Sequence, residues 1–505
     1  MLTINARAVP DSASRWIWLL LAVVFGLCAA ILPSELALAA LVLSVIIVLG
    51  ALSPFAALIV MLLVAPLRTL IATEAAFQLP LDIGQLAVSG FLLAYLLWCS
   101  VRHQPLIQVW RSPLVIALLV FIMIVALSGF MAFSLSAWLS EMLKWVQILI
   151  LVIVLLSFVR RREWEWLVMA LVAAGVANAV VGIYEFFGGS GALHLLINDR
   201  FFRAFGTFGQ PNPFGGFMGL LIPIAAAAAL GYGRRAWVTF RHAYSGSMVY
   251  LGIAVLYALA AGVMGIALGM SWSRGAWLGV AASFVVMAFA LPQRTRRGVI
   301  LLTIMLGVFG LLWSLGLLPE AVVARITSST QEFFAFEDVR GVDISPENYA
   351  VVERLAHWQA AINMLRANPL LGIGFGNYEV VYNQYRLINW TEPLGHAHNY
   401  YLNLLAEVGV LGLLGYGKVW AVIMLMTWRA RHHPDGLARF VVIGLLGTWT
   451  YLGVHSVFDN LYVNNIFLHF GVLAGILAIL YNQLFPGMKA IRYGEYFARR
   501  ASHDS

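Results

Sequence analysis

"HAHNYYLNLLAEVGVLGLLGYGKVWAVIMLMTWRARHHPDGLAR" occupies residues 396–439 and decides the class of fold. Two histidines precede a long apolar run at 399–427, and a cluster of arginines and histidines follows it. A helix of ~20 mostly apolar residues is long enough to cross the hydrocarbon core of a bilayer. The stretch therefore predicts a membrane-spanning helix with the histidine pair at one end and a basic segment at the other.

The composition of the whole chain agrees with a polytopic membrane protein. Of its 505 residues, 62% are hydrophobic and only 11% are charged, and a soluble domain of this length has no core large enough for them. We expect an all-α fold with about 12–14 transmembrane helices. "LSP" alone separates the second and third candidates, which form either two spans or one hairpin element. The candidate spans are 16–33, 35–52, 54–72, 84–100, 113–130, 143–159, 164–187, 212–231, 248–271, 276–291, 299–317, 399–427, 440–458 and 466–485.

The same composition excludes other classes of protein. The net charge of +8 does not indicate a nucleic-acid partner, because in a membrane protein the informative quantity is where Lys and Arg lie. Cys28 and Cys99 both fall in apolar segments, which implies neither a disulfide framework nor a metal cluster. The first apolar run begins at Trp16, and a second follows almost at once, so we interpret the first as a retained span.

The distribution of basic residues predicts the orientation of the chain. When the chain crosses the bilayer at each candidate span, every second connection contains at least two basic residues. The positive-inside rule makes that face cytoplasmic, with both termini inside. The basic residues of these connections are Arg7, Arg15, Arg102, Arg111, Arg160, Arg161, Arg162, Arg234, Arg235, Arg241, Arg294, Arg296, Arg297, Arg429, Arg431, Arg439, Lys489, Arg492, Arg499 and Arg500.

The complementary connections face outward and are of a different kind. Three are short motifs: "FRAFGTFGQPNP" within 188–213, the turn "SWSRGA" at 271–276, and "HSVFDNLYVNN" at 455–465. The fourth is a segment of about 80 residues, long enough for short helices of its own. In it, apolar residues recur at helical spacing over 352–365, and the Pro/Gly break "NPLLGIGFGN" follows.

These features divide the chain into four parts. We expect N-terminal transmembrane helices at 1–200 and transmembrane helices with outward arginine motifs at 201–317. A large periplasmic loop follows at 318–398, and C-terminal helices with a cytoplasmic tail occupy 399–505.

Three outward arginines are candidate ligands for an anion. The turn around Arg274 is so short that its guanidinium lies at the membrane interface, where it either snorkels to lipid phosphates or binds a phosphate-bearing ligand. Arg203 lies among aromatic residues and equally fits an interfacial loop anchor. Arg354 has Glu353 beside it and His357 three residues on, a pattern typical of a solvated helix face.

The histidine pair is a candidate acid–base group. In an extended segment His396 and His398 point the same way, and Asn399 is placed to cap the following helix. An imidazole with a pKa near ~6.5 suits a general base at neutral pH. The alternatives are an ordinary interfacial pair or a metal site, for which no third ligand occurs at a recognisable spacing.

Two carboxylates accompany these histidines. Glu407 lies inside the next helix, where a lone carboxylate needs a partner, so we expect it to orient a histidine or to pair with an arginine. Asp459 and His455 end another helix on the same outer face.

Four motifs together resemble the O-antigen ligase and polymerase superfamily, which includes oligosaccharyltransferases that glycosylate pilin-like proteins. They are "FRAFGTFGQPNPFGGFMGLLIP", "SWSRGAWL", "ERLAHWQAAINMLRANPLLGIGFGNY" and "HAHNYYLNLLAEVGVLGLLGY", in this order between about 200 and 460.

The resemblance implies a glycosyltransferase at the periplasmic face of the bacterial inner membrane that needs no metal or other cofactor. Its donor would be a glycan on undecaprenyl diphosphate, bound by Arg203, Arg274 and Arg354. His398, favoured over His396, would deprotonate the acceptor hydroxyl, and attack by that hydroxyl would invert the anomeric centre. The outer segments contain no DxD motif of the kind that metal-dependent glycosyltransferases carry.

The acceptor stays open at this point. We rank a ligase that uses the lipid A core first, then a polymerase that extends lipid-linked chains, then a protein oligosaccharyltransferase. A different class of function is a transporter for the lipid-linked glycan, which needs a charged pathway across the bilayer. A cavity that joins Arg274, Glu407 and Lys418 favours transport, and one that opens only outward favours transfer.

Overall fold

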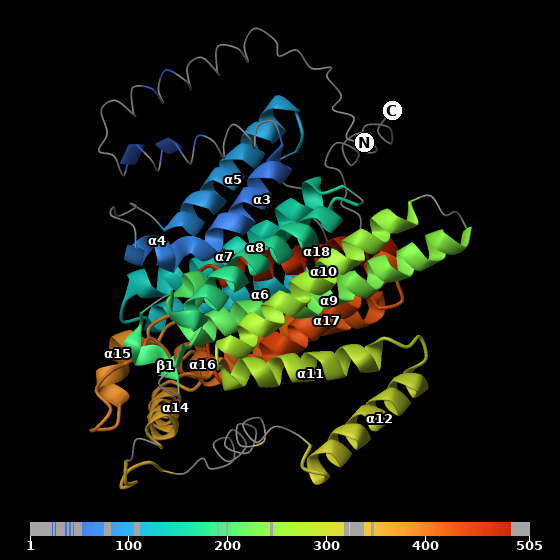
Figure 1. The fold of residues 1–505 in the computed structure, drawn as a ribbon. Coiled ribbons are helices and arrows are strands. Elements are labelled where there is room, and N and C mark those ends of the chain that lie inside the picture. Colours follow the sequence, from blue (N-terminus) through green and yellow to red (C-terminus); the bar gives the residue numbers. More distant parts are fainter. Residues whose placement is uncertain are drawn as a thin grey trace. The chain divides into compact units, whose positions relative to one another are not determined.

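The computed structural model divides the chain into two compact units, Met1–Leu106 and Ile107–Ser505. Figure 1 shows the elements of each, coloured along the sequence. Among the described residues, eleven helices are long and apolar enough to cross a membrane, which confirms the all-α polytopic fold. The described residues are 53–74, 82–105, 112–160, 162–189, 191–197, 200–242, 246–317, 338–344 and 348–485, with isolated positions at 23, 26, 36, 37, 40, 41, 44 and 323.

The first unit contains three described helices. α3 (Pro54–Val64) continues through a short 3-10 turn into α4 (Arg68–Glu74), and α5 (Ile83–Val101) packs against α3. The Asp82 carboxylate accepts the N–H groups of the first turn of α5 and so fixes where this helix begins. The predicted spans 54–72 and 84–100 are confirmed as helices, whereas 16–33 and 35–52 lie outside the continuously described residues.

The second unit contains the other described helices. Every remaining predicted span corresponds to a helix, although the helix at 274–290, with 17 residues, is not among the eleven that are long enough to cross a membrane. The helices are α6 (Pro113–Ser128), α7 (Leu135–Phe158), α8 (Trp164–Tyr184), α9 (Pro211–His242), α10 (Ser247–Met270), α11 (Arg274–Ala290), α12 (Thr295–Ser314), α16 (Tyr400–Ala430), α17 (Gly436–His455) and α18 (Ile466–Leu484).

Two helices begin or end well away from the predicted boundaries. α7 begins at Leu135, eight residues before the predicted 143, because Glu141 and Lys144 pair one turn apart and neutralise each other inside the helix. α9 continues to His242 because its last turns leave the apolar zone as an ordinary polar helix. Hydropathy locates the apolar part of a helix, and the helix itself extends beyond it.

The long outer segment contains the short helices that the sequence predicts. α14 (Tyr349–Ala367) covers the periodic stretch, and α15 (Tyr378–Tyr385) follows the Pro/Gly break. Gly372, Gly374 and Gly376 all have positive φ. A Cβ on Gly372 would lie 2.3 Å from the Glu407 backbone, so only glycine allows this turn to lie against α16.

α16 is interrupted at the point where that turn contacts it. Gly409 has φ 65° and ψ −167°, which breaks the helical hydrogen-bond ladder. The freed N–H of Val410 donates to the Pro369 carbonyl at 2.9 Å. The sequence predicts one unbroken helix here, and the structure instead joins α16 to the outer segment through its backbone.

The two ends of the second unit differ in chemistry. At one end, basic connections contact one another: Arg162 lies 3.6 Å from Asp435, and Arg439 donates to the Leu291 carbonyl. The other end contains the N-termini of α11 and α16, the C-terminus of α17 and the loop before α9. All of the candidate site residues except Glu407 lie at this second end.

Candidate active site

The loop before α9 holds Arg203 in place. A two-stranded hairpin, β1 (Leu196–Ile197) and β2 (Phe201–Phe202), leads into it. The Glu185 carboxylate at the end of α8 accepts the N–H groups of Phe205 and Gly206 at 2.9 and 2.6 Å. The Arg203 guanidinium donates from Nε to the Ser271 carbonyl at 3.1 Å, which ties this loop to the turn between α10 and α11.

Arg203, Arg274 and Arg354 line one cavity of about 240 Å³. They come from three elements: the loop before α9, the first residue of α11, and the first half of α14. None of the described residues that line the cavity is acidic; the others are Asn212, Trp272, Ser273, Gly275, His455 and Phe458. Three guanidiniums in so small a space favour an anion with several oxygens, because each guanidinium can donate two parallel hydrogen bonds.

A glycine allows the walls of this cavity to approach one another. A Cβ on Gly275 would lie 2.9 Å from Cβ of Phe458 and 3.1 Å from the His455 ring. The "SRGA" motif therefore combines a cation with the one residue type that lets α11 pack against the end of α17. The N-terminus of α11 also directs the positive end of its dipole toward this region.

His396, His398 and Asp459 form a cluster beside the cavity. Nε2 of His396 lies 3.3 Å from Oδ1 of Asp459, and Nδ1 of His398 lies 3.9 Å from the same oxygen. Asp459 directly follows Phe458, which lines the cavity. The carboxylate next to the histidines thus comes from the segment after α17.

The hydrogen bonds of His396 fix its tautomer. Its Nδ1 accepts the backbone N–H of His398 at 3.0 Å and therefore carries no proton. The proton of the ring is on Nε2, which faces the Asp459 carboxylate. Both nitrogens of His396 are occupied, so this ring holds the loop in place.

His398 is held in an unusual backbone conformation at the start of α16. Its φ is 52°, a left-handed value that is uncommon for a residue with a Cβ. Asn399 caps α16 as predicted, because its side chain accepts the N–H groups of Tyr401 and Leu402, both at 3.1 Å. The Tyr400 N–H donates to the Ser456 carbonyl and joins the start of α16 to the end of α17.

Burial shifts the pKa values in this cluster and so helps to determine which of its groups are charged. Burial, together with the nearby His396, lowers the pKa of His398 to about 3, so His398 is neutral at pH 7. Burial alone raises the pKa of Asp459, but His396, His398 and His455 outweigh it and bring the pKa below its usual range. The cluster at neutral pH is thus a carboxylate facing an imidazole that has a lone pair to accept a proton.

His357 is a third imidazole in the cluster, and the sequence pattern misplaces it. It is 1% exposed, so α14 does not present a solvated face at this position. Its ring centroid lies 5.7 Å from that of His398, and its Nδ1 contacts the Tyr378 hydroxyl at 2.9 Å. Burial lowers the pKa of His357 to about 4, which leaves it neutral as well.

Glu407 lies behind the cluster and binds backbone. Its Oε1 accepts the Tyr378 N–H at 3.0 Å, and it also contacts the Gly376 N–H and the Asn403 side chain. Asn403 in turn accepts the Ala397 N–H at 3.1 Å, between the two motif histidines. Glu407 therefore connects to the histidine segment through Asn403, while Asp459 is the carboxylate in direct contact. Its expected role in catalysis stays a prediction.

His455 belongs to the cavity, although its sequence position alone assigns it no role. The Tyr451 hydroxyl donates to the Gly215 carbonyl at 2.9 Å and has no second proton. The 2.6 Å contact between that hydroxyl and Nδ1 of His455 therefore requires a proton on Nδ1. In the neutral ring Nε2 is then the acceptor, beside the three arginines.

The same cluster also has the composition of a metal site. Among the described residues, one ligand atom each from His396, His398 and Asp459 lies within 4.8 Å of the other two. The sequence gives no such spacing because Asp459 comes from a distant segment. A bound metal would occupy the lone pair of His398, so metal independence stays a prediction that a chelator can test.

Residues 259–417 match a family model described as O-antigen ligase. This match over part of the chain bears out the predicted resemblance to the O-antigen ligase superfamily, whose type is glycosyltransferase-like, and it fits a bacterial membrane protein. The matched segment includes Arg274, Arg354 and the two motif histidines, whereas Arg203 and Asp459 lie outside it. No curated protein matches the chain.

Proposed function

We propose that this protein transfers a glycan from undecaprenyl diphosphate to an acceptor hydroxyl at the periplasmic face, and that it acts as an O-antigen ligase on the lipid A core. The observation that carries the proposal is the cavity in which Arg203, Arg274 and Arg354 meet beside His398. The diphosphate bears several negative oxygens, and those three guanidiniums complement it.

The reaction follows from this arrangement. The acceptor hydroxyl attacks the anomeric carbon of the donor sugar while His398 removes the hydroxyl proton. The bond between that carbon and the diphosphate oxygen breaks, and the electron pair leaves with the diphosphate. The arginines stabilise the charge that develops on the leaving group, and attack from the opposite side inverts the anomeric centre.

The division of roles between the two histidines supports His398 as the base. His396 uses both of its nitrogens on the loop and on Asp459. His398 is neutral, and its buried Nδ1 makes no hydrogen bond among the described residues while it faces Asp459 at 3.9 Å. The carboxylate favours a proton on Nδ1, which leaves Nε2 to accept the proton of the acceptor, as in other His–Asp pairs.

Transport of the lipid-linked glycan is a weaker candidate. Glu407 and Lys418 are absent from the described residues that line the cavity of Arg274. Glu407 is buried against the outer segment, and Lys418 is exposed on α16. The charged residues that line the cavity thus lie at one end of the helices, and no described charged residue continues the cavity toward the other end, which supports transfer.

The first experiment is reconstitution of the purified protein in liposomes with an undecaprenyl-diphosphate glycan and EDTA. One arm contains lipid A core, one contains no added acceptor, and one contains a Ser/Thr peptide. Product on lipid A core alone supports the ligase. Longer lipid-linked chains would identify a polymerase, and a glycosylated peptide an oligosaccharyltransferase.

Two variants distinguish loss of the proposed base from general damage to the protein. His398→Ala should lose about 100- to 10,000-fold in rate, the usual contribution of a general base. His432→Ala, an exposed histidine at the opposite end of the helices, is the matched control and should keep full activity. Full activity of His398→Ala, or activity that EDTA removes and Zn²⁺ restores, would overturn the mechanism.

A further inference from the structure

A second cavity, of about 900 Å³, lies between α8, α9 and α10. Its volume is near the upper end of the roughly 300–1,000 Å³ that small-molecule sites occupy. Along α8 its lining extends from Glu165 to Ala177, about 18 Å at the rise of an α-helix. That length exceeds half of the ~30 Å hydrocarbon core, so the cavity can hold a chain that spans one leaflet.

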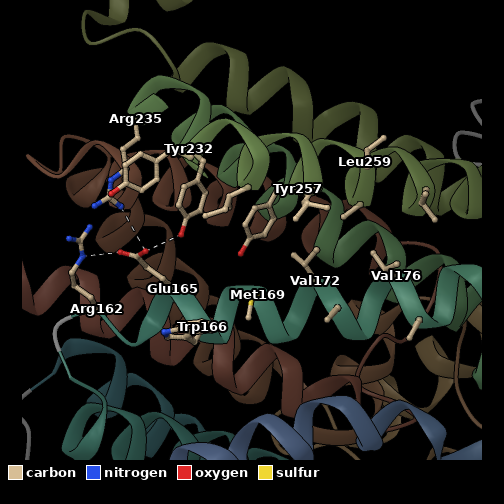
Figure 2. Close-up of a pocket in the computed structure, with 17 residues that line it drawn as sticks. Arg162, Glu165, Trp166, Met169, Val172, Val176, Tyr232, Arg235, Tyr257 and Leu259 are labelled. Atoms are coloured by element: carbon tan, nitrogen blue, oxygen red, sulfur yellow. Dashed lines mark hydrogen bonds and ion pairs between the residues drawn. The ribbon is translucent and has the colours of Figure 1, made fainter. Parts of the chain in front are cut away.

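The two ends of this cavity differ, as Figure 2 shows. Arg162, Glu165, Tyr232 and Arg235 gather at one end. The remaining length is apolar and is lined by Met169, Val172, Val176, Ile253, Leu256, Leu259, Ala260 and Val263, among others. Leu256 is 67% exposed and Leu259 is 61% exposed in the described chain, so the apolar part is open at its side.

The polar end contains both signs of charge. Nε of Arg162 donates to Glu165 at 2.9 Å, and the Tyr232 hydroxyl donates to the other carboxylate oxygen at 2.9 Å. Arg235 lies 3.9 Å from Glu165 and stacks over the Tyr250 ring at 4.6 Å. Each guanidinium has further N–H donors, and the carboxylate has further lone pairs, so a ligand with an anion and a cation fits this end.

We propose that this cavity binds one zwitterionic aminophospholipid from the leaflet at the basic face of the protein. Its phosphate contacts Arg162 and Arg235, its primary ammonium contacts Glu165, and an acyl chain lies along the apolar length. The cavity is at the opposite end of α8 and α10 from the arginine cavity of the active site, so this site is separate from the proposed diphosphate site.

Charge decides among the possible occupants. An isoprenoid chain fits the apolar length but supplies no cation for Glu165. An anionic lipid without an amine supplies the phosphate and repels the carboxylate. A head group with both charges satisfies Arg162, Arg235 and Glu165 together.

Native mass spectrometry of the delipidated full-length protein tests the proposal, with phosphatidylethanolamine, phosphatidylglycerol and undecaprenyl phosphate as separate probes. We expect one tightly held phosphatidylethanolamine, bound about tenfold better than phosphatidylglycerol, because one charge-assisted hydrogen bond is gained. Equal or better binding of either other probe, or no retained lipid at all, would overturn the proposal.

Variants locate the bound lipid. Ala260→Trp fills the apolar length and should abolish retention, while Val255→Trp, on the same helix but outside the lining, should leave it unchanged. Glu165→Gln removes the partner of the ammonium and should abolish the preference over phosphatidylglycerol. Retention that persists in Ala260→Trp would place the lipid elsewhere. The readout is lipid mass, so it is independent of glycan transfer.

Discussion

Nε2 of His396 faces Oδ1 of Asp459 at 3.3 Å, and this contact determines which nitrogen of His396 accepts the backbone N–H of His398. The two residues come from the segments at the start of α16 and after α17, so the contact also joins two helix ends. Asp459 orients His396, and His396 in turn orients the proposed base.

Asp459→Asn tests this chain of contacts. An amide can donate to Nε2 of His396, which moves the ring proton to Nδ1 and removes the acceptor for the His398 N–H. We expect kcat to fall roughly 100-fold or more, as when the carboxylate of a His–Asp pair is neutralised, with a smaller change in KM for the donor. Asp343→Asn, an exposed carboxylate on the outer segment, is the control. Equal rates of Asp459→Asn and wild type in the liposome assay would contradict the assignment.

Arg354→Ala tests the anion site. Because Arg354 lines the cavity with Arg203 and Arg274, its loss should raise KM for the diphosphate donor and lower kcat, together about 100-fold in kcat/KM. Arg366→Ala is the matched control, since Arg366 is an exposed arginine on the same helix α14. Lysine at position 354 should restore only part of the activity, because an ammonium cannot donate two parallel hydrogen bonds. Parallel losses in Arg354→Ala and Arg366→Ala would mean that the effect is on α14 and not on the cavity.

The low pKa values of His398 and His357 predict how stability depends on pH. Burial holds both pKa values, about 3 and about 4, below the ~6.5 of the unfolded chain. Between pH 6.5 and about 4 the unfolded chain therefore binds protons that the folded chain does not, and stability falls as the pH falls. The melting temperature in detergent should be lower at pH 5 than at pH 7.5. His357→Phe should reduce that difference, and an unchanged difference would show that His357 is protonated in the folded protein.

Gly409→Ala tests the interruption of α16. A Cβ there lies 2.3 Å from the Leu370 backbone, and the backbone has a φ of 65° that alanine adopts at a cost of roughly 1–2 kcal/mol. We expect a clear fall in melting temperature and loss of activity together. Gly417→Ala on the same helix has no atom within 4 Å of the new Cβ and should be neutral or stabilising by up to about 1 kcal/mol. A stable, active Gly409→Ala protein would show that the outer segment need not contact α16 here.

Sequence reasoning succeeds where the physics is local. Apolar runs long enough for the bilayer locate the described helices, and a side chain such as Asn399 caps the helix next to it. The alternation of basic connections predicts the side of the membrane, and it does so without knowledge of the distances between residues. It therefore predicts the same face for Arg203, Arg274 and Arg354. Their meeting in one cavity depends on how α9, α11 and α14 pack, which hydropathy does not encode.

Each residue or boundary that the sequence misplaces has a partner that its own sequence pattern does not reveal. Asp459 is assigned no partner from sequence because its contact with His396 joins segments that are distant in the chain. His357 follows Arg354 at a spacing typical of a solvated face, but the Tyr378 and Tyr382 rings cover it. α7 begins earlier than its hydropathy indicates because Glu141 and Lys144 neutralise each other. In each case the partner, and not the residue itself, determines the environment.

The position of Glu407 has a consequence for assembly of the protein in the membrane. Its carboxylate lies in a helix that must enter the bilayer, where an ionised group without partners costs several kcal/mol. The groups that satisfy it, the N–H donors of Gly376 and Tyr378, belong to the outer segment that precedes it in the chain. Stable insertion of α16 during biogenesis therefore requires that the outer segment folds against it. A chain whose outer segment is misfolded leaves this carboxylate without those two N–H donors within the membrane, a defect that cellular quality control can recognise without any test of activity.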